Sequence, residues 1–172
     1  MSFPRRLRGL AYQTFYRLPG RWRGRLARLV SPKYLVGAVT ILRDTDATEA
    51  GGPDRILLLR QPPGRGWGLP AGLLKKHEQP VYGAARELFE ESGVRVDPAD
   101  MTAASPNAIV HVVGVVDVVW HASVRASEVT LRVDGGEVLE AAWFPVDELP
   151  RLTVNAALLL GHYGIGPRAT ER

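Results

Sequence analysis

Three glutamates on a single helical face constrain this chain more than any other feature of its sequence. Pro80 suits a first helical turn and Gly93 suits the left-handed residue that ends a helix, so the sequence predicts a helix over residues 80–92. Successive helical residues advance by about 100°, which brings Glu87, Glu90 and Glu91 within an arc of roughly 100°. Any fold must therefore place this acidic face in solvent or against positive charge.

Positive charge from a divalent cation would explain the crowding. Like charges four residues apart destabilise an isolated helix, and a bound cation removes that cost. Ligation by oxygen alone suits Mg²⁺ or Mn²⁺ rather than zinc. The alternative is a solvated acidic face, which is the commoner explanation of a charge cluster taken alone. That alternative does not explain Gly72, Glu78, Arg86 and Gly93 at fixed offsets around the glutamates.

Composition limits the chemistry and the location. The 172 residues include no cysteine, which excludes a disulfide framework, a thiolate metal site and a thiol nucleophile. Residues 1–34 carry nine Lys or Arg and no acid, which leaves 13 bases against 18 acids in the rest. The arginines recur every few residues, so this segment is not a signal peptide. No apolar run approaches the roughly 18–20 residues of a membrane span, and we expect a cytoplasmic protein.

The basic segment at residues 1–33 is predicted to form two short amphipathic helices. Leu7 to Leu18 and Trp22 to Val30 each show apolar residues at three- and four-residue steps, and Pro19-Gly20 separates them. One interpretation is a weak contact with an anionic lipid surface or with nucleic acid. The other is a capping extension that packs its apolar face on the domain or on a second subunit, which would make a homodimer.

The rest of the chain predicts one mixed domain of helices and strands. Polar or Gly/Pro-rich loops are expected at residues 44–53 and 62–68. A short helical turn is expected at 146–149 and a helix at 154–163. Strands are expected at residues 34–42, 55–60, 109–124 and 137–144. The sequence therefore indicates a single α+β domain with a basic extension.

The offsets around the glutamates match a known motif. The segment resembles the Nudix box, G-x5-E-x7-R-E-U-x-E-E-x-G-U, where U is a bulky aliphatic residue. Every defined position is satisfied, by Gly72, Glu78, Arg86, Glu87, Leu88, Glu90, Glu91, Gly93 and Val94. Residues 67–72 and 137–150 also resemble the segments that lead into and close the family's domain. One departure is Ala71, where the family usually has glycine.

The resemblance implies a fold and a domain division. The fold is the Nudix fold, a mixed β-sheet sandwiched between helices in an α/β/α arrangement, preceded here by the basic helical extension. The implied Nudix hydrolase domain covers residues 34–166. Residues 1–33 then form the extension and residues 167–172 a C-terminal tail.

The resemblance also assigns metal ligands and structural residues. Glu87, Glu90 and Glu91 are expected to bind Mg²⁺ or Mn²⁺, together with the backbone carbonyl of Ala71. Arg86 and Glu78 are expected to form an ion pair that holds the loop against the helix. Two glycines, Gly72 and Gly93, are expected to shape the turns on either side.

Catalytic and substrate-binding residues follow from the same resemblance. Glu91 and Glu87 are the expected catalytic residues of the box. Glu137 is a further candidate because some members carry an additional metal-binding or catalytic glutamate near that place, with an ordinary exposed carboxylate at a strand end as its alternative. Arg60, at the end of a predicted central strand, is a candidate phosphate contact. Trp67 is a candidate for stacking on a base, with core packing as its alternative.

The implied reaction is hydrolysis of a diphosphate bond in a nucleoside diphosphate linked to another group. A nucleoside triphosphate, a nucleotide sugar and ADP-ribose all remain open as substrates. The alternative function is a catalytically silent Nudix-fold module that binds or senses a nucleotide. Such a module would be expected to lose the metal glutamates, and none is lost here.

Overall fold

The structure is a computed structural model that describes residues 12–63, 66–111 and 114–169. It consists of two compact units, Met1–Lys33 and Tyr34–Arg172. In the first unit, residues 12–17 are helical and Pro19 precedes a second helix, α2 (Gly20–Val30). The predicted pair of helices is therefore present, although residues 7–11 of the first lie outside the described residues. No helix in the described part of the chain is long and apolar enough to cross a membrane.

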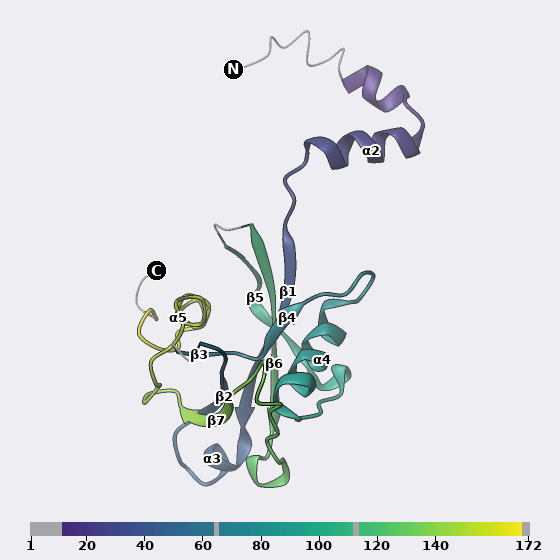
Figure 1. The fold of residues 1–172 in the computed structure, drawn as a ribbon. Coiled ribbons are helices and arrows are strands. Elements are labelled where there is room, and N and C mark those ends of the chain that lie inside the picture. The colour runs from purple at the N-terminus through teal and green to yellow at the C-terminus, as the bar shows by residue number, and fades with distance from the viewer. Residues whose placement is uncertain (1–11, 64–65, 112–113, 170–172) are drawn as a thin grey trace. The chain divides into compact units, whose positions relative to one another are not determined.

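A mixed sheet forms the centre of the second unit (Figure 1). Its strands are β1 (Leu35–Asp44), β2 (Arg55–Arg60), β3 (Trp67–Gly68), β4 (Ala71–Leu73), β5 (Thr102–His111), β6 (Val115–Val124) and β7 (Glu140–Pro145). The strand β1 runs parallel to β6 along its whole length and antiparallel to β4 and the start of β2. Both β7 and β3 pair with β2, and β5 pairs with β6.

Helices cover both faces of this sheet, which confirms the predicted α/β/α arrangement. Alternate residues of a strand point to opposite faces, so neighbouring β1 residues enter different halves of the core. Ala38 packs in a cluster with Leu88 of α4 (Pro80–Ser92), whereas Val39 packs in a cluster with Leu160 of α5 (Val154–Gly161). Figure 1 shows α4 and α5 on opposite sides of the strands. Near the end of α4, Glu91 bonds to Ala71 in β4 and to Gln61, which follows β2.

Several elements follow the sequence closely. The strand β2 and the helix α4 have the predicted bounds, 55–60 and 80–92. The four-residue apolar run of β2 is buried throughout, as expected for a strand in the middle of a sheet. The helix α5 begins at the predicted residue, where the Thr153 hydroxyl accepts a hydrogen bond from the Ala156 N–H, but it ends two residues early.

Other elements correct the sequence predictions. The valine-rich run at 109–124 is two strands rather than one, because Gly114 has a positive φ of 79° that breaks it between β5 and β6. The loop predicted at 44–53 contains a short helix, α3 (Thr45–Glu49), because the Asp44 side chain caps its first turn. Short 3₁₀ turns lie at Pro98–Asp100 and Ala126–Glu128. Residues 167–169, in the predicted tail, form a turn.

The region before and after β7 also differs from the prediction. The strand begins at Glu140 and not at residue 137, because the Asp134 carboxylate accepts hydrogen bonds from the N–H groups of Gly136, Glu137 and Val138. These bonds hold the three residues in a tight loop. After β7 the chain makes a turn at residues 146–147 where a helical turn was predicted. Glu137 therefore lies in a loop beside the sheet.

Candidate active site

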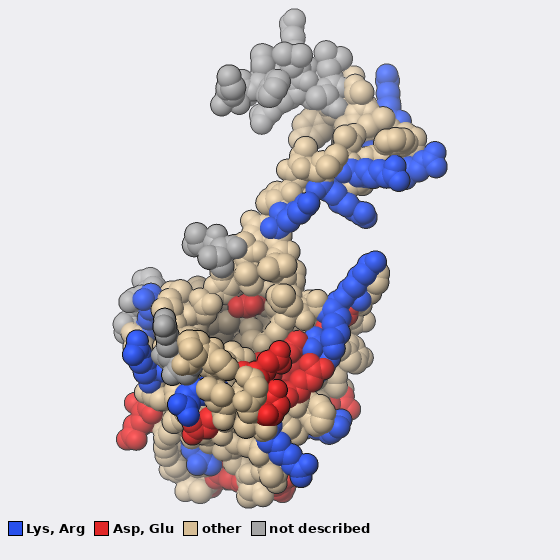
Figure 2. Space-filling model, viewed as in Figure 1, with Lys and Arg blue, Asp and Glu red and all other residues tan. Residues whose placement is uncertain are grey.

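The helix α4 brings the box residues to the sheet in a fixed register. Pro80 occupies its first turn, and Gly93 ends it with a φ of 75°, a left-handed conformation that glycine adopts without strain. Between these ends the glutamates face the strand β4 and the loop that follows it. Figure 2 shows acidic side chains gathered in one band on this side of the unit, over α4.

A guanidinium group ties the loop after β4 to the helix. The Arg86 Nε donates to Glu78 Oε1 at 2.8 Å, and its Nη2 donates to Glu78 Oε2 at 2.8 Å and to the Leu73 carbonyl at 3.2 Å. This fork holds the pKa of Glu78 down at about 2, chiefly through the hydrogen bonds from Arg86. The same contacts raise the pKa of Arg86 above its usual range. Arg86 and Glu78 thus form the ion pair that the sequence suggested.

The same guanidinium also reaches two of the box glutamates. Its Nη1 donates to Glu87 Oε1 at 2.6 Å and to Glu90 Oε2 at 2.9 Å. One oxygen of each carboxylate is engaged in this way, and the second oxygen of each makes no such bond to Arg86. The charge repulsion between Glu87 and Glu90 is therefore partly offset within the helix itself.

Glu91 has a different environment, because its carboxylate is buried. Only 7% of the residue is exposed, and burial raises its pKa to about 7, with the charges of Glu87 and Glu137 acting in the same direction. Two hydrogen bonds oppose that shift: the Ala71 N–H donates to Oε2 at 2.8 Å and Gln61 Nε2 donates to Oε1 at 2.7 Å. Glu91 is thus a buried carboxylate that, within the described residues, accepts hydrogen bonds but forms no ion pair.

Gln61 was not predicted from the sequence. It follows the buried strand β2 directly, so its side chain emerges where a central strand ends. A polar residue at that position was the available signal, because functional side chains often lie at the ends of central strands. Its amide is the only side-chain donor to Glu91 among the described residues.

Gly72 lies within the strand β4 and not in the turn that the sequence predicted, and it permits a close approach between α4 and this strand. A Cβ atom at residue 72 would lie closer than 3.0 Å to the carboxyl group of Glu87. Real Cβ atoms do not approach other atoms this closely, so any larger residue would displace Glu87 from the strand. Glu87 is 14% exposed in its side chain and lies against the backbone of β4.

The three box glutamates lie on one face of α4, but their carboxylates do not point to a common position. Among the described residues, no group of three or more acidic, histidine or cysteine side chains is arranged to hold a metal ion. Glu87 and Glu90 turn to Arg86, while Glu91 turns to Ala71 and Gln61. The donor set nevertheless fits a hard divalent cation, because it consists of carboxylate oxygens and includes the buried Glu91, for which the described part of the chain supplies no ion pair.

The candidate substrate-binding residues lie together on β2 and β3. Arg60 Nη2 bonds to Glu140 Oε2 at 2.6 Å across the β2–β7 pair, and its Cζ lies 5.9 Å from the centre of the Trp67 ring. Trp67 packs edge-on against Phe144 at 4.7 Å and joins the core on the α5 side. Within the described residues, nothing accepts a hydrogen bond from the buried Arg60 Nε. Among the residues that the structure describes, no ion pair joins Arg60 to the glutamates of α4.

The loop before β7 brings Glu137 into electrostatic range of the box. Its backbone N–H donates to Asp134 Oδ2 at 3.3 Å, and its side chain is exposed. The charge of Glu137 contributes to the raised pKa of Glu91. The fold therefore brings this residue, about 45 positions further along the chain, near the acidic face of α4.

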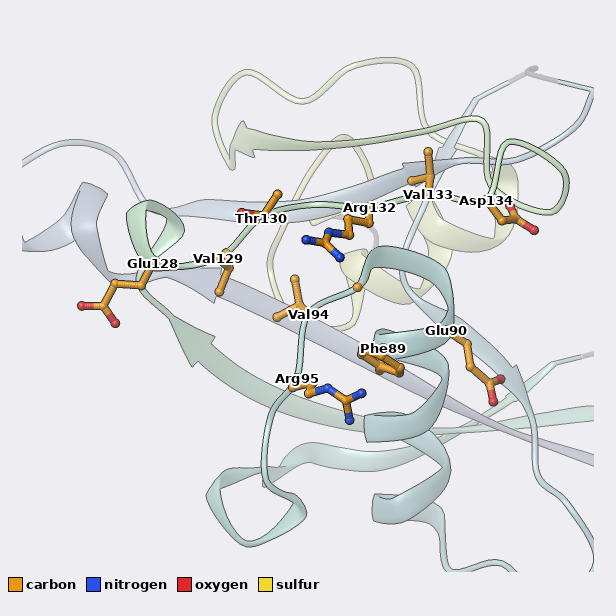
Figure 3. Close-up of a pocket in the computed structure, with 11 residues that line it drawn as sticks. Phe89, Glu90, Val94, Arg95, Glu128, Val129, Thr130, Arg132, Val133 and Asp134 are labelled. Carbon is orange, nitrogen blue, oxygen red and sulfur yellow. The ribbon is translucent and has the colours of Figure 1, made fainter.

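A cleft of about 730 Å³ lies at the C-terminal end of α4 (Figure 3). Glu90 lies at its edge, whereas Glu87 and Glu91 do not line it. Arg132 approaches the cleft from the segment before β7, and Arg95 lies over the Phe89 ring at 3.7 Å. This cleft was not predicted from the sequence, because its walls come from segments about 40 residues apart.

Comparison with known proteins agrees with this geometry. The family described as NUDIX domain matches residues 33–160. A MutT-like protein of Streptomyces ambofaciens is 37% identical over 62 residues, which are 36% of this chain and 40% of that protein. The chain thus spans less than half the length of this relative.

Solved structures show the same fold. A MutT NUDIX hydrolase from Burkholderia pseudomallei is 25% identical, with a TM-score of 0.58, over 74% of this chain and 96% of that one. The NUDIX domain of Shewanella oneidensis NrtR, solved with ADP ribose, is 16% identical, with a TM-score of 0.59, over 88% and 95% of the two chains. The family match covers most of the chain and includes the whole box, so this protein belongs to the NUDIX hydrolase family, as its sequence predicted.

Proposed function

We propose that this domain hydrolyses a diphosphate bond in a nucleoside diphosphate linked to another group, with Mg²⁺ or Mn²⁺ as cofactor. The observation that carries the proposal is Glu91, a buried carboxylate with a pKa near 7 beside two further acidic side chains. Burial of an acid without a cation is costly, and such groups concentrate at functional sites. Family membership supports pyrophosphate hydrolysis in general.

The residues proposed to hold the metal are Glu87, Glu90 and Glu91, with the carbonyl of Ala71. Arg86 uses one oxygen of Glu87 and one of Glu90. The second oxygen of Glu90 lies 3.5 Å from Lys75 Nζ in an exposed pair, which a divalent cation would have to displace. The Ala71 N–H already bonds to Glu91, which keeps residue 71 beside the acidic face. A bound divalent cation supplies charge stabilisation in the transition state and lowers the pKa of a coordinated water.

Residues of the chain itself supply position and proton transfer. The fork between Arg86 and Glu78 fixes the loop that carries Gly72 and thereby the place of Glu87. Glu91 and Glu137 are the candidates for accepting a proton from the attacking water. A base works best when its pKa lies near the working pH, and the pKa of Glu91 in the metal-free protein is about 7.

Arg60 and Trp67 are proposed to bind the substrate. The Arg60 side chain is 40% exposed at the end of β2, so its guanidinium group can reach a phosphate oxygen. Trp67 already packs on Phe144, so any stacking on a base would use its remaining exposed side. A nucleoside triphosphate, a nucleotide sugar and ADP-ribose are the proposed substrates, and the ADP ribose in the NrtR structure supports including the last.

The alternative is a domain that binds a nucleotide without cleaving it. The intact set of Glu87, Glu90 and Glu91 favours hydrolysis over this alternative. A cytoplasmic location and a homodimer stay predictions.

A substrate panel tests the proposed reaction. The protein is incubated with each nucleotide class in Mg²⁺, in Mn²⁺ or in EDTA, and the products are separated by chromatography. We expect metal-dependent release of a nucleoside monophosphate and a second phosphorylated product. Glu91→Gln should slow the reaction by about 10³-fold or more, since one catalytic acid or base contributes about 10²–10⁴-fold. The matched control is Glu148→Gln, an exposed carboxylate after β7, which should retain the wild-type rate. Turnover that persists in EDTA, or unchanged in Glu91→Gln, contradicts the proposal.

A further inference from the structure

The helix α2 exposes a bulky apolar stripe. Leu29 is 79% exposed, Val30 83%, Trp22 48% and Leu26 41%. With about 100° per residue, these four side chains fall within an arc of roughly 100°. No residue of α2 is buried. An apolar face of this kind usually binds another surface, because exposed clusters of large hydrophobic side chains mark interaction sites.

Arginines flank this stripe on both sides. By the same helical geometry, Arg25 borders one edge of the stripe and Arg23 borders the other. The Arg25 Cζ lies 5.4 Å from the centre of the Trp22 ring, so the cation stays beside the apolar edge. Residues 1–34 contain nine Lys or Arg and no Asp or Glu. The surface that covers the stripe must therefore be apolar in its centre and negative at its margins.

We propose that α2 binds the surface of an anionic lipid bilayer, with its axis in the plane of the interface. The stripe would enter the boundary between headgroups and acyl chains, while the flanking arginines extend to lipid phosphates. Two tyrosines of the preceding helical residues, Tyr12 at 64% and Tyr16 at 66% exposed, suit the same interfacial layer. The helix has 11 residues, so it lies on the bilayer and does not span it. This inference is independent of the proposed reaction.

Charge distinguishes the bilayer from the other occupants. A second copy of α2 would bring arginines against arginines, and the segment has no acid to pair with them. Nucleic acid would attract the arginines but offers little to aliphatic side chains such as Leu29 and Val30, which are the most exposed of the stripe. An anionic bilayer satisfies both requirements at once.

Vesicle binding of the full chain tests this proposal. The protein is titrated with vesicles of equal parts phosphatidylglycerol and phosphatidylcholine, and with vesicles of phosphatidylcholine alone. We expect binding to the first kind only, weakened by salt, with a blue shift of tryptophan emission that Trp22→Phe removes. Each charge removed near the surface should weaken binding about fivefold.

A matched pair of variants separates the stripe from the charge. Leu29→Glu and Gly24→Glu change the net charge equally, but residue 24 lies on the opposite side of α2, where an added Cβ meets no atom within 4 Å. Leu29→Glu should weaken binding at least tenfold more than Gly24→Glu, because it also removes a leucine that the bilayer would bury. Equal losses in the two variants would overturn the proposal. Equal binding to both vesicle types would also overturn it. So would binding to duplex DNA or RNA that Leu29→Glu leaves intact. A dimer that Leu29→Glu dissociates, without any vesicle binding, would overturn it as well.

Discussion

Two glutamates near opposite ends of the box, Glu78 and Glu91, lie in opposite electrostatic environments. At the first end, Glu78 receives two hydrogen bonds from one guanidinium, and its pKa falls to about 2. At the second end, Glu91 is buried beside other acids, and its pKa rises to about 7. The first carboxylate has a cationic partner, whereas the second accepts hydrogen bonds only from neutral groups among the described residues. Two glutamates of one motif can therefore have opposite pKa shifts, because each shift depends on what surrounds the carboxylate.

After Glu91→Gln, the largest expected effect on the rate comes from a larger side chain at residue 72. Gly72→Ala should lower the hydrolysis rate about 100-fold, because the added Cβ displaces Glu87 from β4 and a shift of about 1 Å can cost that much. Steady-state rates in Mg²⁺ measure this. Gly68→Ala is the control, since its Cβ would meet only atoms at 4.0 Å. Similar rates for the two variants would contradict the role given to the close approach.

Unfolding of the metal-free protein at different pH values tests the raised pKa of Glu91 at the second end of the box. The folded pKa of Glu91 is raised above its unfolded value of about 4.5, so the stabilising contribution is full below pH 4.5 and is lost as pH rises through about 7. Urea unfolding in EDTA should show a loss approaching about 3 kcal/mol over this range. Glu91→Gln should remove that pH dependence, and a slope that survives in this variant would assign it to another group.

Glu78 should show the opposite dependence, since its folded pKa is depressed. Its contribution is present above pH 4.5 and is lost as pH falls toward 2. A double-mutant cycle with Arg86→Met and Glu78→Gln should give a coupling energy of about 2 kcal/mol by chemical denaturation. The exposed pair of Arg125 and Glu49 is the matched comparison, for which about 0–1 kcal/mol is expected. Equal couplings would mean that the partial burial of the first pair adds nothing.

The smallest expected effect comes from the amide that supports Glu91. Gln61→Met should lower stability by about 1 kcal/mol and the rate by less than tenfold, because one hydrogen bond to the carboxylate is lost while the Ala71 N–H remains. Thermal unfolding and steady-state rates measure both. A loss as large as that of Glu91→Gln would instead give Gln61 a direct part in the reaction.

Local signals in the sequence were enough to predict much of this unit. Pro80 and Gly93 bound α4 correctly because the conformations they favour are local, and the burial of β2 followed from its unbroken apolar run. The break between β5 and β6 was missed because Gly114 stands within a valine-rich run that satisfies strand propensity on both sides.

Features that depend on tertiary contacts could not be predicted in the same way. The contact of Gln61 with Glu91 joins residues 30 positions apart, and the cleft beside Glu90 joins segments about 40 apart. The opposite pKa shifts of Glu78 and Glu91 require knowledge of burial, which two glutamates in one motif do not reveal.

The bonds from Arg86 to Glu87 and Glu90 have a consequence for folding in the absence of a metal ion. A built-in cation already occupies part of the acidic face, so the helix does not depend on an external ion to fold. We expect newly made chains to accumulate as stable apoprotein. If the proposed cation binds this face, its supply would then change how many molecules are active more than how many are folded.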